Sequence, residues 1–280
     1  MKLAAIILGV LLLTLGAACY LAARRWRRTT DDFAARLTAP ALRAAPTAFH
    51  LQDLEGLPAP VARYLRTVLP EGRPLIRVAR LSQRGTFLFR PTPDGWRPFV
   101  STEYFTSAPP GFVWDARIRV MPGVDALVRD AFLDDAGHMR ASIAGLVTVL
   151  AVHQTPEIAA GALHRYLAEA AWFPSALLPS QGVVWSAVDD STARATLTRG
   201  GTTVSLDFRF GADGLVSSVY APARFRDVGG RGVPTPWRGR FRRYEPRDGV
   251  TIPLDGEVEW VLPEGPQPYW RGTIDEVTFQ

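Results

Sequence analysis

The segment ARATLTRGGTTVSLDF, residues 193–208, alternates apolar and polar side chains on both sides of the pair Gly200-Gly201. Two glycines between alternating runs predict a β-hairpin with a two-residue turn, because such turns need backbone conformations that glycine adopts freely. The turn pairs Arg199 with Thr202 and thereby sets the register of every pair upstream.

This register separates the side chains of the hairpin by polarity. One face carries only apolar pairs, which are Leu197 with Val204, Ala195 with Leu206, and Ala193 with Phe208. The other face carries only polar pairs, which are Thr198 with Thr203, Thr196 with Ser205, and Arg194 with Asp207. One apolar and one polar face are typical of an antiparallel sheet that is buried on one side.

Turn residues divide the rest of the chain after Arg73 into similar short runs. A turn at Asp213-Gly214 would extend the hairpin by placing Phe208 beside Val219, Leu206 beside Ala221, and Val204 beside Ala223. The inward residues alternate between large side chains and alanines, so the apolar face leaves room for another element.

The segment from Pro156 to about Trp172 is predicted to be a helix that fills this room. Thr155 is a favourable N-cap, Pro156 suits the first helical position, and Glu157 interacts favourably with the helix dipole. Apolar residues recur along the segment at helical spacing, and Pro174 ends it. We therefore predict an α+β fold, mainly antiparallel β, in which a curved meander sheet or half-barrel surrounds the central helix 156–172.

A second hairpin contains most of the charge of the body. Residues 224–247 carry eight arginines and two acids, and residues 248–280 carry seven acids and one arginine. A turn at Asp248-Gly249 sets Arg242 opposite Asp255, Arg240 opposite Glu257, and Arg238 opposite Glu259. The arginines could form an anion or nucleic-acid patch, but this register favours a ladder of cross-strand ion pairs. We expect no nucleic-acid partner.

The N-terminal segment Leu3 to Ala23 has 21 consecutive residues without a charge. At about 1.5 Å per residue it spans a hydrocarbon core of roughly 30 Å. Arg24-Arg25-Trp26-Arg27-Arg28 follows at once, whereas a cleaved signal peptide has a shorter apolar region. We expect a retained single-pass anchor in the cell inner (cytoplasmic) membrane, with a charge bias that favours the cytoplasmic side for the domain. Lipidation at Cys19 is the alternative.

The charge distribution distinguishes the N-terminal segment from the rest of the chain. The net charge of the 280 residues is +5, and it comes from the flanks of the apolar segment, because residues 29–280 hold 27 basic and 27 acidic residues. We expect an anchor with a basic flank over 1–28, a helical and loop connector over 29–73, and a β-rich domain over 74–280. Cys19 is the only cysteine, which excludes an intramolecular disulfide and a four-thiolate metal site.

Sequence signatures of the common catalytic sites are absent. No two of the four histidines lie at three- or four-residue spacing, so we expect neither a metal nor another cofactor. Within residues 164–174, Arg165 and Glu169 lie one helical turn apart and form either a polar cluster beneath an apolar concavity or a plain surface ion pair. The candidate ligand-binding residues are Arg165, Tyr166, Glu169, Trp172, Val204, Leu206 and Phe208.

Several aromatic and proline positions occur together in the same part of the chain. They are RYLAEAAWFPSALLP (165–179), Val183-Val184-Trp185, Pro236-Trp237-Arg238-Gly239, Ile252-Pro253 and Glu257-Val258-Glu259-Trp260. On these residues the chain resembles, over roughly 57–279, an uncharacterised bacterial family of membrane-anchored proteins, a domain of unknown function. The resemblance implies no activity and no catalytic residues. The expected architecture is similar to the half-barrels of bacterial lipoprotein carriers, which hold acyl chains between sheet and helix.

Three functions are compatible with these features. The first is non-catalytic binding of an apolar or amphiphilic ligand, plausibly a lipid, between the sheet and the helix 156–172. The second is a hydrolase that uses Glu169 or Asp189 with an arginine. The third is a protein-interaction module in a membrane complex, with the Trp- and Arg-rich surface of 224–247 as its contact patch. No protein partner can be named from the sequence.

Overall fold

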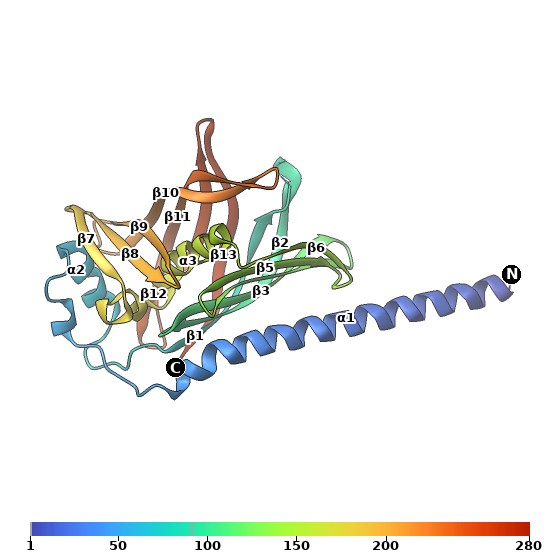
Figure 1. Cartoon of the computed structure of the whole chain (residues 1–280), viewed down its shortest axis with the longest axis horizontal. Helices are drawn as coiled ribbons and strands as arrows, with labels where there is room; N and C mark the ends of the chain where they lie inside the picture. The colour runs from blue at the N-terminus through green and yellow to red at the C-terminus, as the bar shows by residue number, and fades with distance from the viewer. Residues whose placement is uncertain (1, 91) are drawn as a thin grey trace.

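Thirteen strands form one antiparallel sheet in the computed structural model, which describes residues 2–90 and 92–280 (Figure 1). The strands are β1 (Val78–Leu88), β2 (Trp96–Ser107), β3 (Pro110–Met121), β4 (Val124–Leu133), β5 (Ala136–Ile143), β6 (Val147–His153), β7 (Val184–Asp189), β8 (Thr192–Arg199), β9 (Thr202–Phe210), β10 (Val216–Val228), β11 (Arg231–Arg247), β12 (Val250–Leu262) and β13 (Gly265–Phe279). The sheet curves around helix α3 (Pro156–Glu169), which confirms the predicted fold class.

The strand order explains why α3 lies inside the curve. The order in space is β6-β5-β4-β3-β2-β1-β13-β12-β11-β10-β9-β8-β7, so β1 to β6 and β7 to β13 are two meanders joined through β1 and β13. The two edges of the sheet, β6 and β7, are therefore consecutive in sequence, and α3 is the segment that connects them. The helix packs against β4 and β5 on one side and against β8, β9 and β10 on the other.

The predicted register of the β8–β9 hairpin is confirmed for all six pairs across Gly200-Gly201. The predicted pair of Phe208 with Val219 is also present. However, the β9–β10 ladder ends at Asp207 and Tyr220, so the further pairs with Ala221 and Ala223 are not formed. Pro222, which follows directly, has no N–H to donate to β9, and β10 continues from there along β11 alone.

The start of α3 also agrees with the sequence. The Thr155 hydroxyl accepts a hydrogen bond from the Ile158 N–H at 3.3 Å, as an N-cap does. The helix ends at Glu169, and its last expected turn, Ala170–Trp172, is a 3-10 turn. Two more short 3-10 turns, Pro174–Leu177 and Pro179–Gln181, lead to β7.

The two arms of the sheet meet at one end of the half-barrel. Arg199, at the β8–β9 turn, forms an ion pair of 2.8 Å with Asp135 at the β4–β5 turn. Gly200 has a positive φ of 53°, and a Cβ there would collide with the Asp135 side chain. Glycine is thus required both for the turn and for the contact between the arms.

The charged β11–β12 hairpin has the predicted register, with Arg238 opposite Glu259 and Arg240 opposite Glu257. The ion pairs follow this register only in part, because arginine side chains are long enough to reach diagonal neighbours. Arg238 and Arg240 both contact Glu259, at 2.5 and 3.1 Å. Glu257 instead pairs with Arg271, which lies opposite it on β13, and the partner of Asp255 is Arg243 rather than Arg242.

Helix α1 (Lys2–Arg43) runs without interruption from the apolar N-terminal segment onto the sheet. Its C-terminal half buries Trp26, Thr30, Ala34, Leu37 and Ala41, five residues that lie along one side of the helix. Leu37 packs with Val113, Ala131 and Leu133 in a small cluster separate from the main core. Because Phe112 and Trp114 belong to the main core, α1 covers the outer face of the sheet.

Polar contacts hold α1 in place on the outer face. The Trp26 indole donates to Asp115 at 2.6 Å, and the Arg129 guanidinium donates to the Trp26 carbonyl and to the Thr30 hydroxyl. After α1, the short helix α2 (Ala59–Val68) packs near β8 and β12.

Candidate functional site

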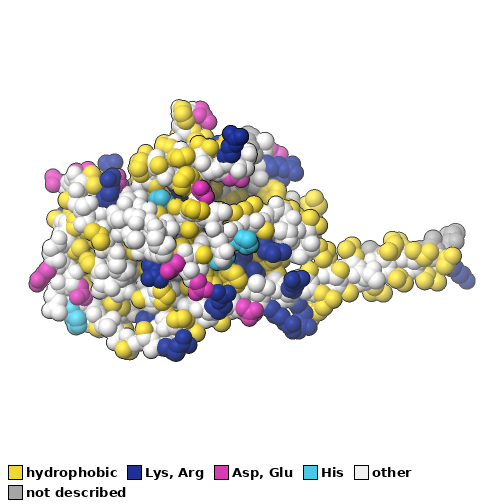
Figure 2. All heavy atoms as spheres, in the orientation of Figure 1, with side chains coloured by type: hydrophobic (Ala, Val, Ile, Leu, Met, Phe, Trp, Pro, Cys, Tyr) yellow, Lys and Arg dark blue, Asp and Glu magenta, His cyan; other side chains and the backbone are white. Residues whose placement is uncertain are grey.

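A cavity of about 1070 Å³ lies between α3 and the concave face of the sheet. Its walls come from β1, β3 to β6, and β10 to β13, together with one side of the helix. In Figure 2 the surface is hollowed below the β10–β11 side of the molecule, and hydrophobic side chains lie in the hollow. The aromatic residues of the lining include Trp114, Trp172, Trp237, Phe241, Trp260, Tyr269 and Trp270.

Glycines on adjacent strands make room for two of these indole rings. Gly85, Gly272 and Gly256 stand side by side on β1, β13 and β12. A Cβ at Gly272 would overlap the ring of Trp270, and a Cβ at Gly256 would lie 3.3 Å from the ring of Trp172. The two rings are 6.2 Å apart between centroids. The glycine row therefore lets the aromatic wall of the cavity lie flat against the sheet.

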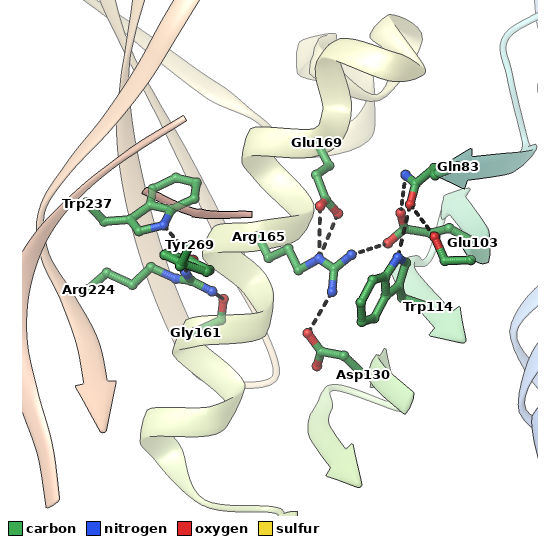
Figure 3. A network of polar contacts seen from close by, with 11 residues as sticks. Gln83, Glu103, Trp114, Asp130, Gly161, Arg165, Glu169, Arg224, Trp237 and Tyr269 are labelled. Atoms are coloured by element: carbon green, nitrogen blue, oxygen red, sulfur yellow. Dashed lines mark hydrogen bonds and ion pairs between the residues drawn. The ribbon is translucent and has the colours of Figure 1, made fainter. Parts of the chain in front are cut away.

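Arg165 is the centre of a buried ion cluster in the cavity wall (Figure 3). Its guanidinium contacts Glu103 on β2 at 2.8 Å, Asp130 on β4 at 2.8 Å, and Glu169 one helical turn away at 2.9 and 3.0 Å. The guanidinium also lies 4.9 Å from the ring centre of Trp114. Three carboxylates therefore surround a single cation that is only 15% exposed.

The environment of the cluster favours retention of a proton. Burial raises the pKa of Glu103 well above its usual value, Arg165 opposes this shift, and the neighbouring carboxyls Glu169 and Asp130 add to it. Burial likewise raises the pKa of Glu169, against the attraction of Arg165. Gln83 donates to Glu103 at 2.9 Å and fixes its far oxygen. Burial therefore favours the neutral form of Glu103 and Glu169, which within the described residues share the single cation Arg165.

A second polar group lies on the other side of α3, around Arg224 (Figure 3). Its guanidinium donates to the Tyr269 hydroxyl at 3.0 Å and to the Gly161 carbonyl at 3.1 Å. The Trp237 indole donates to the same hydroxyl at 2.8 Å, and its ring centre lies 4.8 Å from the guanidinium. Within the described residues, two buried donors that belong to lining side chains have no partner, Arg224 Nε and Trp172 Nε1.

Of the seven predicted ligand-binding residues, three line the cavity and four are buried elsewhere. Arg165, Glu169 and Trp172 line the cavity. Tyr166 is buried in the core, where its hydroxyl donates to the Thr106 carbonyl at 3.0 Å. The other three, Val204, Leu206 and Phe208, are buried where β9 packs on α3, away from the cavity. The room next to the alanines of this hairpin is filled by the helix itself.

Asp189 and the segment 224–247 are the other candidate sites in the sequence. Asp189 lies at the end of β7, where it accepts hydrogen bonds from the Ser191 N–H and hydroxyl at 2.8 and 3.0 Å. It does not belong to the cavity lining. In the segment 224–247, Trp237 is buried, whereas Phe225, Val228 and Val233 are exposed. The exposed apolar side chains of this segment therefore gather at its β10–β11 end.

Sequence reasoning missed Glu103 and Asp130, the two cluster members that come from strands. A signal for Glu103 exists, because Phe99, Ser101, Glu103 and Phe105 alternate with outward residues and all face the core. A glutamate on the apolar side of a strand needs a buried partner. The missing information was which arginine supplies it, since Arg165 is 62 residues away in sequence.

Residues 55–279 match a family of unknown function, DUF6920, and no curated protein matches the sequence. Among solved structures, the chain is similar to the LolA superfamily protein NE2245 from Nitrosomonas europaea, at 10% identity and a TM-score of 0.40, over 83% of this chain and 94% of that chain. It is also similar to a DUF1329 family protein from Desulfovibrio piger ATCC 29098, at 11% identity and a TM-score of 0.38, over 73% and 86%. A third is the β-barrel-like DUF1849 protein from Brucella abortus, at 9% identity and a TM-score of 0.27, over 74% and 99%.

Proposed function

The chain belongs to the DUF6920 family, whose function is unknown, and we propose from its own geometry that it binds an apolar or amphiphilic, lipid-like ligand without chemical conversion. The observation that carries this proposal is the cavity of about 1070 Å³ between α3 and the sheet. Small-molecule sites are typically about 300–1,000 Å³ and mostly apolar, with a few placed polar groups. The cavity fits this description and is slightly larger than the usual size range.

The polar groups of the lining support an amphiphile rather than a plain hydrocarbon. Arg165, Asp130 and Glu169 already satisfy one another in the wall. The open part of the lining, formed by the start of α3 and the β10–β11 hairpin, carries Glu157, Arg226, Asp227 and Arg231. An acyl chain would lie along the aromatic wall, and its polar end would meet the charged residues at the opening.

We also infer that the apolar half of α1 is a retained membrane anchor. By length and composition this helix can cross a membrane, with a mean hydropathy of 2.4 in its most apolar window. The support for retention is the unbroken helix, which continues from Leu3–Ala23 to side chains buried against the sheet. Intact-mass measurement of the membrane-extracted protein tests this, because a chain that begins near Ala23 or Arg24 would contradict retention.

The four exposed arginines after the anchor favour the cytoplasmic side of the inner membrane for the domain. A reporter fused after Gln280 that is active only outside the cytoplasm would overturn this assignment.

Native mass spectrometry of the full chain, released from detergent micelles, tests the binding function. The wild type is expected to retain lipid, whereas Ala141→Trp fills the cavity from β5 and is expected to lose it. Ala187→Trp is the matched control, because Ala187 is exposed on β7 and does not line the cavity. Equal retention in both variants, or none in the wild type, would contradict binding in the cavity.

A hydrolase is the second candidate, and the specific observation in its favour is the raised pKa of Glu169 in the cavity wall. Carboxyls with raised pKa values in a cleft are typical of general acids. Against catalysis, both oxygens of Glu169 already contact Arg165. The two functions are distinguished by the mass of the lipid after incubation, which stays unchanged in a binding protein and falls in a hydrolase.

A further inference from the structure

Several hairpin turns lie at the end of the sheet that is nearest to the N-terminal half of α1. The β3–β4 and β5–β6 turns are neighbours, because the Ala144 N–H donates to the Asp125 carbonyl at 2.9 Å. The β1–β2 turn lies at the same end, since Phe99 near the start of β2 pairs with Ile118 near the end of β3. In Figure 1 the β5–β6 hairpin extends along α1 toward its N-terminus.

The β5–β6 turn touches α1 at the end of the apolar segment. A Cβ at Gly145 would lie 3.2 Å from the Cβ of Ala22, so the turn backbone packs directly on the helix. Ala22 is the last residue but one of the uncharged run Leu3–Ala23. If this run spans the hydrocarbon core, the β5–β6 turn lies at the level where the helix leaves the membrane.

Large apolar side chains are exposed at this level. We define the apolar rim as Met121, Leu146, Val147 and Val149, which are 58%, 44%, 61% and 56% exposed. Elsewhere in the described strands, the exposed large hydrophobic residues are Val100, Val184 and Val188, together with Phe225, Val228 and Val233 at the β10–β11 end, which are 39%, 45% and 41% exposed. A concentration of exposed apolar side chains at one place marks a contact surface rather than ordinary surface composition.

The charges around the rim indicate what it contacts. Arg24, Arg25, Arg27 and Arg28 are all exposed on the turns of α1 that follow Ala22. Basic residues next to a membrane span attract anionic lipid headgroups, while apolar side chains at the same depth enter the interface. This combination favours a lipid surface over a protein partner.

The rim is also continuous with the cavity through β6. Leu150 and Val152 line the cavity, whereas the alternate residues Val147 and Val149 are exposed. Successive side chains of a strand point to opposite faces, so a single edge strand presents one face to the cavity and the other to the surroundings. Among the described strands, β6 is an edge of the sheet and has a neighbour only on the side of β5.

We propose that the apolar rim rests in the interface of the anionic membrane that α1 crosses, and that the cavity takes up a bilayer lipid directly from this membrane past β6. The proposal rests on the proposed function and names its ligand as a lipid of the same bilayer. In this arrangement the protein binds at the membrane surface and takes its lipid from the bilayer beside β6.

Fluorescence quenching of the full chain in vesicles of phosphatidylcholine and phosphatidylglycerol tests the rim. In a Cys19→Ala background, Val147→Cys is labelled with an environment-sensitive dye, and the vesicles contain lipids with a nitroxide near the headgroup. Val188→Cys on β7 is the matched control, because it is also an exposed valine in an edge strand, with 51% exposure. We expect loss of fluorescence at residue 147 and none at residue 188, and equal fluorescence at both positions would overturn the proposal.

A second variant connects the rim to uptake. Val147→Asp places a charge in the interface, so the rate of uptake of a fluorescent phospholipid from vesicles is expected to fall while the amount bound at equilibrium is kept. Val188→Asp is expected to change neither quantity. Unchanged uptake in Val147→Asp would overturn direct transfer past β6.

These outcomes test the membrane contact of the rim independently of lipid binding in the cavity. Lipid retained in native mass spectra without quenching at residue 147 contradicts the rim and leaves the binding function intact. Quenching at residue 147 without retained lipid supports the membrane contact and contradicts the binding function. If the membrane-extracted protein has lost the apolar half of α1, the membrane contact of the rim is contradicted, because no anchor then holds the rim at the membrane.

Discussion

At the scale of single residues, Arg165 determines the charge balance of the cavity wall. The guanidinium pairs with carboxyl groups from β2, β4 and α3, and it is nearly buried itself. Removing one partner of a buried ion pair is costly, because the remaining charges lose their compensation. The pair of Arg165 and Glu169 could be predicted from their spacing in the helix. Glu103 and Asp130 could not, because strands 62 and 35 residues away supply them.

Arg165→Met is expected to lower the free energy of unfolding by about 3–5 kcal/mol, because three carboxyl groups lose their cation. Urea denaturation followed by circular dichroism measures the change. Arg194→Met is the control, since its pair with Asp207 lies on the surface and should contribute less than about 1 kcal/mol. A similar small effect for both variants would contradict the central role of Arg165 in the wall.

The raised pKa of Glu103 predicts a dependence of stability on pH. Since the folded state holds the proton more tightly than the unfolded chain, the contribution to stability is complete below the ordinary pKa of 4.5 and is lost as the pH rises through the folded-state pKa. The free energy of unfolding of the wild type should therefore decline as the pH rises from 4.5 through the folded-state pKa of Glu103. Glu103→Gln stays neutral at every pH and should flatten the decline, so parallel profiles for the two proteins would contradict a buried protonated Glu103.

At the scale of elements, the β8–β9 hairpin was predictable because its turn and its alternation specify the same register. The end of the β9–β10 ladder could have been predicted from Pro222, which has no N–H to donate. The choice of ion pairs in β11–β12 could not, because it depends on a third strand and on side-chain length. The glycine row under Trp270 and Trp172 could not be predicted either, because its members come from three strands, β1, β12 and β13.

Gly272→Ala tests the glycine row. A Cβ would overlap the ring of Trp270, so the indole must move, and overpacking of this kind costs about 1–3 kcal/mol. Gly161→Ala is a contrasting control, because nothing lies within 4 Å of a Cβ there and alanine favours the helix by up to about 1 kcal/mol. Thermal unfolding of both variants measures the difference, and a stable Gly272→Ala protein would contradict the packing described here.

At the scale of the whole molecule, α1 joins a segment able to cross a membrane to the outer face of the sheet. The apolar run was evident from composition. The docking surface of the same helix consists of Trp26, Thr30, Ala34, Leu37 and Ala41, which recur at helical spacing, but the sequence alone does not identify the outer face of the sheet as its partner. Long-range partners such as Asp115 and Arg129 complete it.

Leu37→Ala is expected to destabilise the docked helix by about 2–5 kcal/mol, because it leaves a cavity in a small closed cluster. Leu42→Ala is the control on the same helix, since Leu42 is 40% exposed. Hydrogen exchange of residues 26–43 measures the opening of this segment. Equal exchange rates in the two variants would contradict the docking of α1 on the sheet.

We infer that a membrane lipid occupies the space between α3 and the sheet. Photo-crosslinking of the full chain in vesicles that contain phospholipid with a diazirine in the acyl chain tests it most directly, because each crosslink identifies the peptide next to the lipid. We expect crosslinks on peptides from residues 156–172 and 224–241, which line the cavity, in addition to those on the apolar half of α1. Crosslinks confined to α1 would contradict it.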